Sequence, residues 1–468
     1  MRWRISGDRR DGVNIKNFAL VQLVPKDMRS QESINLGLEI IKHKVESCGW
    51  NVDLYKFGEK IDKDKYDIIG FNLFYVTQML NLVPFLKQNN IEVFSEKRGK
   101  PLLIAGGQGV QNPKPINKII DIFTIGDGEE NILNIIKNFE NDSLKNLLNF
   151  DGIYYPKYNN QITFGRVNEI KSDPVIFKKR AMIELNRGCK YRCKFCQYGW
   201  TGGKHREKSI ELVKQQVNDI LDQGVKNINF LSCNIGGYSK IKELLSYCIL
   251  KNVRLLNTDV RIDEYTEDVA AMLNILKVRT LKVGLESFSE KTRFECGKKI
   301  TDKQFKKFIE TAINNNISNF HFYLIYGLPS EEDYEKWFYY IESVKNRIKN
   351  VERNIRLEYS IMNFEPSIFT PYEHEPLIDF VEKHKFLNKY LQLLEKIGNI
   401  QDASTKWYKN MHGRLGRKEE PYKITMWLLH GDESINDVLY DLDIKGVGRS
   451  INLKVYEKIS KYGVFDNL

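Results

Sequence analysis

Long apolar runs are the first feature that this sequence lacks. No stretch approaches the roughly 18 consecutive apolar residues that a membrane-spanning helix needs, and the first four residues, Met-Arg-Trp-Arg, carry no apolar export signal. Cysteine is sparse, with 7 in 468 residues, which excludes a disulfide-rich secreted scaffold. These absences predict a cytoplasmic protein without a membrane segment.

The charge is unbalanced toward the cationic side, with a formal net charge of +11. Most of the excess lies downstream of residue 150. Such an excess suits an anionic partner, and nucleic acid is one candidate. A solvated, lysine-rich surface gives the same composition, so both interpretations stay open.

Strand and helix patterns alternate through residues 1–150, which predicts a doubly wound parallel sheet. The predicted strands are 18–25, 52–57, 67–75, 102–107 and 122–125, and the predicted helices are 33–48, 79–88 and 129–138. Ligands of such sheets lie at the carboxyl ends of the strands. Glycines gather at these ends, and Gly106, Gly107 and Gly126 are candidate cofactor contacts.

Downstream of this domain the pattern restarts. Residues 151–180 are predicted to be a linker that contains a hairpin over 154–164 with an Asn-Asn turn. Six strand–helix repeats in 181–375 predict a partial parallel (β/α)6 barrel with its active site at the carboxyl rim. Residues 376–468 are predicted to form a helical C-terminal domain, whose segment 442–450 resembles the phosphate-binding turn of a helix-hairpin-helix.

Three of the seven cysteines are clustered, at Cys189, Cys193 and Cys196, with three and two residues between them. Chance placement of cysteines at these offsets has a probability on the order of one in several hundred. Three thiolates on one short loop can hold three corners of an iron–sulfur cluster and leave one iron open. Zinc held by the same cysteines and His205 is the alternative.

This cysteine spacing, with the aromatic Phe195 before the last cysteine, resembles the cluster loop of the radical S-adenosylmethionine (SAM) superfamily. The resemblance implies a 4Fe-4S cluster whose open iron binds SAM and cleaves it to a 5′-deoxyadenosyl radical. It also implies an external electron donor of the flavodoxin or ferredoxin type.

Further segments resemble radical SAM families that include methylthiotransferases and cobalamin-dependent methylases. Val283-Gly284-Leu285-Glu286-Ser287 ends the fourth barrel strand, and the resemblance places Glu286 near the SAM ribose, with Ser287 beside it. Leu324 to Pro329 ends the fifth strand and resembles the segment that passes the adenine. The SAM-binding residues implied by these segments are Phe195, Glu286, Ser287, Ile325 and Gly327.

The loop after the second barrel strand departs from the superfamily. Members often carry Gly-Gly-Glu there, whereas this chain has Ser232-Cys233-Asn234-Ile235-Gly236-Gly237. Asn234 or Ser232 is a candidate substitute for the missing acid. Cys233 is a candidate catalytic thiol or a buried structural one, and Arg261 is a candidate contact of the SAM carboxylate.

Residues 15–140 resemble the cobalamin-binding domain that precedes many radical SAM enzymes. The resemblance rests on Ala105-Gly106-Gly107, Asn112-Pro113 and Gly126-Asp127-Gly128-Glu129. The family's Asp-x-His-x-x-Gly loop is missing, and His43 is the one histidine of this region. Cobalamin is therefore expected to bind without a protein imidazole, or the domain has lost the cofactor.

These expectations combine into one leading function and two alternatives. The leading function is radical SAM methylation of an unactivated carbon with cobalamin as methyl carrier. The first alternative is a cobalamin-independent radical rearrangement, decarboxylation or thiolation, with a nucleic-acid base as one substrate candidate. The second is a nucleic-acid-binding protein with a structural metal.

Overall fold

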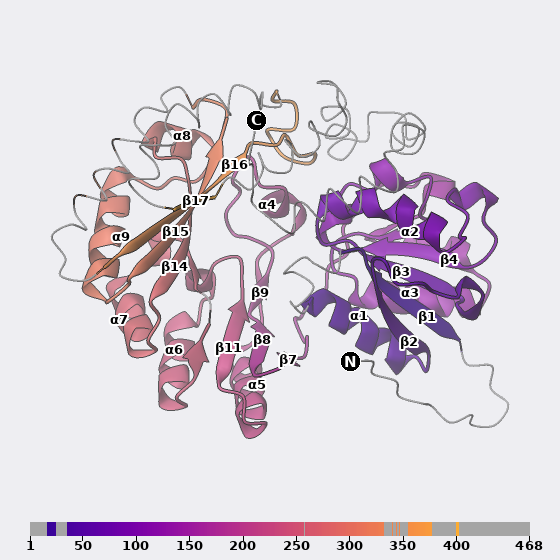
Figure 1. Cartoon of the computed structure of the whole chain (residues 1–468), viewed down its shortest axis with the longest axis horizontal. Coiled ribbons are helices and arrows are strands. Elements are labelled where there is room, and N and C mark those ends of the chain that lie inside the picture. Colours follow the sequence, from indigo (N-terminus) through magenta and orange to yellow (C-terminus); the bar gives the residue numbers. More distant parts are fainter. Residues whose placement is uncertain are drawn as a thin grey trace. The chain divides into compact units, whose positions relative to one another are not determined.

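A six-stranded sheet forms the centre of the N-terminal part of the chain, with the strand order β2-β1-β3-β4-β5-β6 (Figure 1). Its strands are β1 (Asn17–Gln22), β2 (Asn51–Lys56), β3 (Ile68–Asn72), β4 (Leu102–Gly106), β5 (Ile122–Thr124) and β6 (Ile153–Tyr154). Neighbouring strands pair in parallel, except that β6 runs antiparallel to β5. The strand order reverses between β1 and β3, where open α/β sheets bind their ligands.

Helices cover both faces of this sheet. Helices α1 (Leu36–Ser47) and α3 (Glu129–Glu140) share one apolar cluster with Phe18 and Ile68. Helix α2 (Leu82–Gln88) covers the other face, where Phe85 meets Phe71 edge-on at 5.7 Å. The predicted doubly wound sheet is confirmed.

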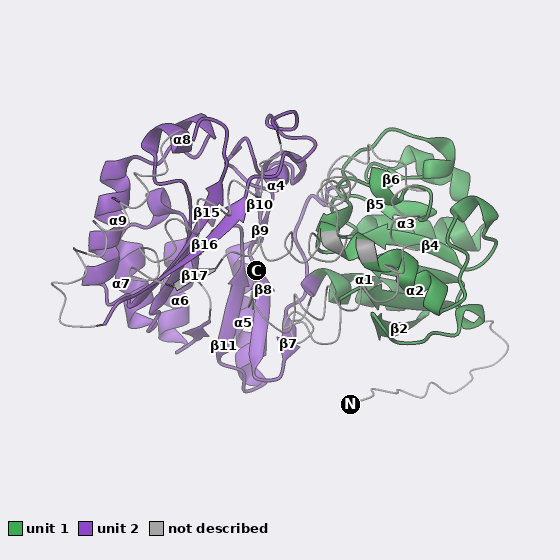
Figure 2. Ribbon diagram, turned by 45° about the horizontal axis from the view of Figure 1, so that its top comes forward, with its two compact units in different colours: residues 1–26, 37–165 green, residues 27–36, 166–468 purple. Residues whose placement is uncertain are grey.

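The computed structural model describes residues 16–24, 35–256, 258–331, 354–376 and 399–401, together with residues 339, 343 and 346. The chain divides into two compact units (Figure 2). Unit 1 comprises residues 1–26 and 37–165, and unit 2 comprises residues 27–36 and 166–468. Within the described ranges, no helix has both the length and the apolar character needed to cross a membrane.

Unit 2 is built on two main sheets with the orders β12-β11-β8-β7 and β13-β14-β15-β16-β17, and β9 pairs with β10 in a short ribbon. The strands are β7 (Val175–Phe177), β8 (Arg180–Glu184), β9 (Asn186–Arg187), β10 (Arg206–Glu207), β11 (Asn227–Leu231), β12 (Arg254–Leu255), β13 (Asp259–Val260), β14 (Thr280–Glu286), β15 (Asn319–Tyr326), β16 (Arg356–Asn363) and β17 (Asn399–Gln401). The predicted partial barrel corresponds to these two main sheets, in which β8 pairs in parallel with β11, and β14, β15 and β16 pair in parallel in that order.

The helices of unit 2 are α4 (Gln197–Thr201), α5 (Ile210–Asp222), α6 (Ile241–Leu250), α7 (Glu267–Ile275), α8 (Glu290–Glu295) and α9 (Asp302–Asn314) (Figure 1). Four of them, α5, α6, α7 and α9, share one apolar cluster with the strands. Helix α9 shows why such segments are helical. Thr301 and Gln304 form a capping box at its start, and Phe305, Phe308 and Ile309 recur at helical spacing on its buried side.

Three sequence predictions differ from the structure. The hairpin over 154–164 is wrong, because β6 pairs with β5 and the chain continues into a 3-10 turn at Pro156–Tyr158. The third strand of the predicted barrel is present as two short strands, β12 and β13, which belong to different sheets. The helix predicted at 79–88 begins with a 3-10 segment, Val76–Asn81.

The C-terminal prediction cannot be compared in the same way. The predicted helical domain 376–468 and its turn at 442–450 lie outside the described residues, except for residue 376 and strand β17.

Candidate active site

The cysteine loop connects strand β9 to helix α4. Gly188 starts the loop in a left-handed conformation with φ of 73°, and a Cβ atom there would overlap the Lys204 carbonyl. Only glycine combines this backbone with this close approach. At the other end, Cys196 is the residue that precedes α4. The local backbone therefore fixes where the loop begins and ends.

Hydrogen bonds hold the loop from both of its sides. The Gly188 N–H donates to the Tyr198 hydroxyl at 2.8 Å, and the Trp200 indole N–H donates to the Cys193 carbonyl at 3.0 Å. The Lys194 N–H donates to the Cys296 carbonyl at 2.8 Å, which ties the loop to the segment after α8. The loop is thus preorganised by protein contacts alone.

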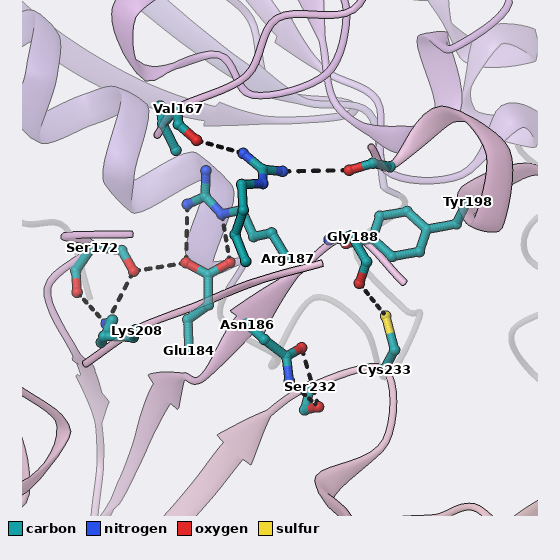
Figure 3. Close-up of polar contacts among 12 residues, drawn as sticks. Val167, Ser172, Glu184, Asn186, Arg187, Gly188, Tyr198, Lys208, Ser232 and Cys233 are labelled. Carbon is teal, nitrogen blue, oxygen red and sulfur yellow. Dashed lines mark hydrogen bonds and ion pairs between the residues drawn. The ribbon is translucent and has the colours of Figure 1, made fainter. Parts of the chain in front are cut away.

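A polar network below the loop anchors the end of β8 (Figure 3). Glu184 accepts two hydrogen bonds from Arg187, at 2.7 and 2.9 Å, and a third from the Ser172 hydroxyl at 2.7 Å. The buried Lys208 ammonium donates to the Ser172 carbonyl at 2.6 Å. Bidentate pairing of this kind fixes orientation, so the strand delivers Gly188 and Cys189 in one direction.

Burial disfavours the thiolate form of two thiols in this loop. Burial raises the pKa of Cys196 to about 11, and burial also raises the pKa of Cys193, although Lys298 and Arg261 oppose the rise. Cys189 is close enough to both thiols to contribute to each pKa. Binding of iron as thiolate would therefore release protons.

The zinc alternative requires three or four side chains to converge on one metal position. Among the described residues, no three His, Cys, Asp or Glu side chains converge on one metal position. A mononuclear zinc site needs its ligands at about 2.0–2.3 Å from one point, whereas a cubane spreads its thiolates over separate corners. His205 faces Glu207 at 3.7 Å.

Cys233 lies beside the start of the cysteine loop. Its thiol approaches the Gly188 carbonyl at 3.9 Å (Figure 3). The side chain is open to solvent, yet the surrounding protein raises its pKa to about 12, and Cys189 and Cys196 add to the rise. The structure therefore brings the predicted thiol to the cysteine loop, and its catalytic role stays a prediction.

Two residues of the predicted SAM pocket meet in one small apolar cluster. Ile325, at the end of β15, is 7% exposed and packs with Leu328 and Phe364, and Phe195 of the cysteine loop packs against the same cluster. Gly327 has φ of 83°, a left-handed conformation that glycine adopts without strain. The cysteine loop and the end of β15, which are 130 residues apart in the sequence, therefore meet in this cluster.

Glu286 ends β14 beside the cysteine loop and is ion-paired. Its Oε1 lies 2.8 Å from the Lys298 ammonium, and both side chains are buried. Glu286 has φ of 68° and lies at a register shift between β14 and β15. A side chain at Gly284 would overlap this carboxylate, so the glycine leaves room for the pair. Strained backbone of this kind is typical of functional sites.

Ser287 serves the protein's own packing. Its hydroxyl donates to Glu331 and accepts from the Ser289 N–H, and its carbonyl accepts from Arg293. The predicted role of Ser287 at SAM has no support in these contacts.

The loop after β11 is contacted by an acid that the sequence analysis missed. Glu264 follows β13 and accepts hydrogen bonds from the Asn234 amide and the Tyr191 hydroxyl, and it also pairs with Lys190. Although burial opposes ionisation, Lys190, Tyr191 and Asn234 lower the pKa of Glu264. A carboxylate thus contacts this loop from the turn that follows β13. The Asn234 Oδ1 is buried and has no hydrogen-bond partner in the structure.

Arg261 is buried and held by the protein. Its guanidinium pairs with Asp263 at 2.7 Å, donates to the Lys298 carbonyl at 2.8 Å and lies 3.7 Å from the centre of the Tyr191 ring. These contacts give Arg261 a role in organising the cysteine loop, and its contact with the SAM carboxylate stays a prediction.

The three glycines predicted at a cofactor in unit 1 meet protein atoms instead. A Cβ at Gly106 would overlap Thr124, and one at Gly107 would lie 2.5 Å from the Leu73 carbonyl oxygen. Gly126 forms a bridge with Gly165. Packing within the protein therefore accounts for each glycine, and direct contact with a cofactor stays a prediction.

Comparison with known proteins identifies the class of enzyme. Residues 183–338 match the model of the radical SAM superfamily, and residues 46–156 match that of the N-terminal domain of radical SAM proteins. The chain therefore contains a radical SAM domain, and enzymes with this domain use a 4Fe-4S cluster and SAM and typically need an electron donor.

Curated relatives have low identity. An uncharacterised protein of Methanocaldococcus jannaschii is 25% identical over 402 residues, which cover 81% of this chain and 84% of that protein. The tRNA-2-methylthio-N(6)-dimethylallyladenosine synthase of Neorickettsia sennetsu is 26% identical over 268 residues, 52% of this chain and 53% of the synthase. This chain therefore spans about half of that synthase.

The fold resembles that of a solved methyltransferase. TsrM of Kitasatospora setae, with tryptophan substrate and a SAM analogue bound, aligns with a TM-score of 0.56 and 12% identity over 79% of this chain and 76% of TsrM. A second TsrM structure, with cobalamin and a 4Fe-4S cluster, aligns with a TM-score of 0.55, again at 12% identity, over 76% of this chain and 74% of that one. At this identity the likeness concerns the fold.

Proposed function

We propose that the protein is a radical SAM methylase in which unit 1 binds cobalamin and unit 2 binds the cluster and SAM. Cobalamin supplies a methyl group, and the cluster with SAM supplies the one-electron chemistry that activates a carbon. Support comes from the TsrM-like fold and from an observation at the end of the β1 and β3 strands of unit 1.

Two buried amides carry the cobalamin proposal. Gln78 is 1% exposed and accepts hydrogen bonds from the N–H groups of Phe74 and Tyr75, just after β3, while its Nε2 has no partner in the structure. Asn81 is 0% exposed and donates to the Leu23 carbonyl, just after β1, while its Oδ1 has no partner in the structure.

Buried polar atoms without partners are rare and costly. The two amides lie where the strand order reverses, and the corrin ring of cobalamin is edged with amide groups that complement both a free donor and a free acceptor. The rings of Phe74 and Tyr75 are exposed and meet edge to face, with their centres 4.8 Å apart, so they add an apolar surface at this end of the sheet. The chemistry of these residues fits cobalamin. His43 is exposed on α1 and is not among the residues at this end of the sheet, so we expect cobalamin to bind without a protein imidazole on cobalt.

In unit 2 the proposed roles follow the contacts. Cys189, Cys193 and Cys196 hold the cluster. Phe195 and Ile325 pack on SAM, and Gly327 lets backbone approach it. The Oε2 of Glu286 accepts from the ribose hydroxyls, because Oε1 is used by Lys298. The free Oδ1 of Asn234 accepts from the SAM ammonium.

Cobalamin retention tests the methylase proposal. After anaerobic expression with iron and cobalamin, the desalted protein should keep cobalamin absorption bands. Gln78→Glu should weaken cobalamin binding about tenfold, because the carboxylate still accepts from two N–H groups but loses the Nε2 donor. Gln88→Glu, on the exposed end of α2, is the matched control and should bind normally. Wild-type protein that retains no cobalamin would refute methyl transfer from it.

Thiolation of a nucleic-acid base is the second candidate. The observation that favours it is the identity with tRNA methylthiolating synthases over about half the chain. Product mass separates the two reactions, because thiolation adds sulfur to the substrate whereas the methylase adds one methyl group.

A further inference from the structure

Three charged side chains from three separate segments lie behind Cys193. Arg261 follows β13, Glu286 ends β14, and Lys298 follows α8. The Lys298 ammonium pairs with the Glu286 carboxylate at 2.8 Å. The backbone carbonyl of Lys298 accepts a hydrogen bond from the Arg261 guanidinium at 2.8 Å. Lys298 is 9% exposed. A buried lysine needs a partner to stay charged, and Glu286 provides it.

The position of Lys298 relative to the cysteine loop is fixed by backbone packing. The Cys296 carbonyl accepts from the Lys194 N–H. Gly297 is left-handed, with φ of 85°, and a Cβ there would lie 3.2 Å from the Arg192 carbonyl and 3.4 Å from the Cys193 Cα. The segment that carries Lys298 therefore lies directly against the residue proposed to hold an iron.

Lys298 is a cation at this position. The Glu286 carboxylate lies 2.8 Å from its ammonium, and an ion pair of this kind keeps both buried groups charged. The segment that carries Lys298 packs against Cys193 through Gly297.

We propose that Lys298 is a positioning residue that raises the reduction potential of the cluster held by Cys189, Cys193 and Cys196. Reduction adds one negative charge to the cluster, and a fixed, poorly solvated cation nearby stabilises that charge. The Lys298 ammonium binds Oε1 of Glu286, which leaves Oε2 to accept from SAM. This inference rests on the cluster assignment made above.

The test is a redox titration of the 4Fe-4S protein without SAM, followed by electron paramagnetic resonance. Lys298→Met should shift the midpoint to more negative potential, with about a tenfold change in the reduction equilibrium, which is about 59 mV for one electron. Glu286→Gln should shift it in the opposite direction. Lys299→Met removes the same charge from the neighbouring, exposed position and should leave the midpoint unchanged.

Further variants separate tuning from folding. Lys298→Met leaves the buried Glu286 carboxylate unpaired. The double variant Glu286→Gln/Lys298→Met removes both charges and so leaves no unpaired one. Its midpoint should still lie below that of the wild type, by a smaller shift than in Lys298→Met alone. Iron and sulfide content is measured for each protein. Full clusters with one common midpoint in all variants would overturn the inference, whereas a wild-type protein that binds no cluster would overturn the proposed function instead.

Discussion

Lys208 gives the fold a pH dependence that can be calculated from its surroundings. The side chain is 1% exposed, and its ammonium donates to the Ser172 carbonyl and to the Gln216 side chain, at 2.6 and 3.0 Å. Burial lowers the pKa of Lys208 to about 8, against an ordinary value of about 10.5. The unfolded chain therefore binds this proton more tightly than the folded protein does.

The sign of the effect follows from that difference. Below pH 8 Lys208 is protonated in both the folded and the unfolded protein. The folded protein then bears the full free-energy cost of a buried charged lysine, about 3 kcal/mol for a pKa difference of about 2.5. As the pH rises from 8 toward 10.5 the folded protein loses the proton first, so the cost is relieved. Between pH 7 and pH 9.5 this group should raise the free energy of unfolding by about 2 kcal/mol.

Replacement of Lys208 by Met isolates this contribution. We expect the wild-type protein to gain about 2 kcal/mol over Lys208→Met between pH 7 and pH 9.5, measured by anaerobic urea unfolding. The lost hydrogen bonds lower the stability of the variant by an amount that does not depend on pH. Lys226→Met, at an exposed position, should keep the wild-type slope. Equal slopes for wild type and Lys208→Met would refute the lowered pKa.

Two further predictions concern the cysteine loop. Cys193→Ala should lose most of its iron and sulfide, whereas Cys248→Ala, in the core on α6, should keep both; an unchanged iron content in Cys193→Ala would contradict the ligand assignment. Gly188→Ala should lower the thermal midpoint more than Gly224→Ala does. Both glycines are left-handed, which costs an alanine about 1–2 kcal/mol, but a Cβ at Gly224 meets open space while one at Gly188 overlaps the Lys204 carbonyl. Equal midpoints for the two variants would show that the loop can shift away.

Much of the architecture could be predicted from local sequence patterns. Three kinds of signal are local, because each depends only on a short stretch of chain: continuous apolar strands, capped amphipathic helices such as α9, and the Cys-x3-Cys-x2-Cys spacing. A single sequence is enough to recognise them. The family resemblance assigned Phe195 and Ile325 to one SAM pocket, and in the structure Phe195 packs against the apolar cluster that contains Ile325.

The residues that the sequence did not reveal depend on long-range contacts. Lys298 is one cation in a chain with 72 lysines and arginines, and its burial beside Glu286 and Cys193 follows from packing of distant segments. Glu264 contacts Asn234 in the loop after β11 from a separate segment, the turn after β13. The hairpin at 154–164 failed because its first strand found a partner in β5. Spacing in one sequence gives no signal for such contacts.

Reductive cleavage of SAM tests the central claim most directly. Wild-type protein with a reconstituted cluster, SAM and dithionite should form 5′-deoxyadenosine, detected by liquid chromatography, and Cys193→Ala should form none. A wild-type protein with a full set of iron and sulfide that forms no 5′-deoxyadenosine, or a Cys193→Ala variant that forms as much as wild type, would contradict the account.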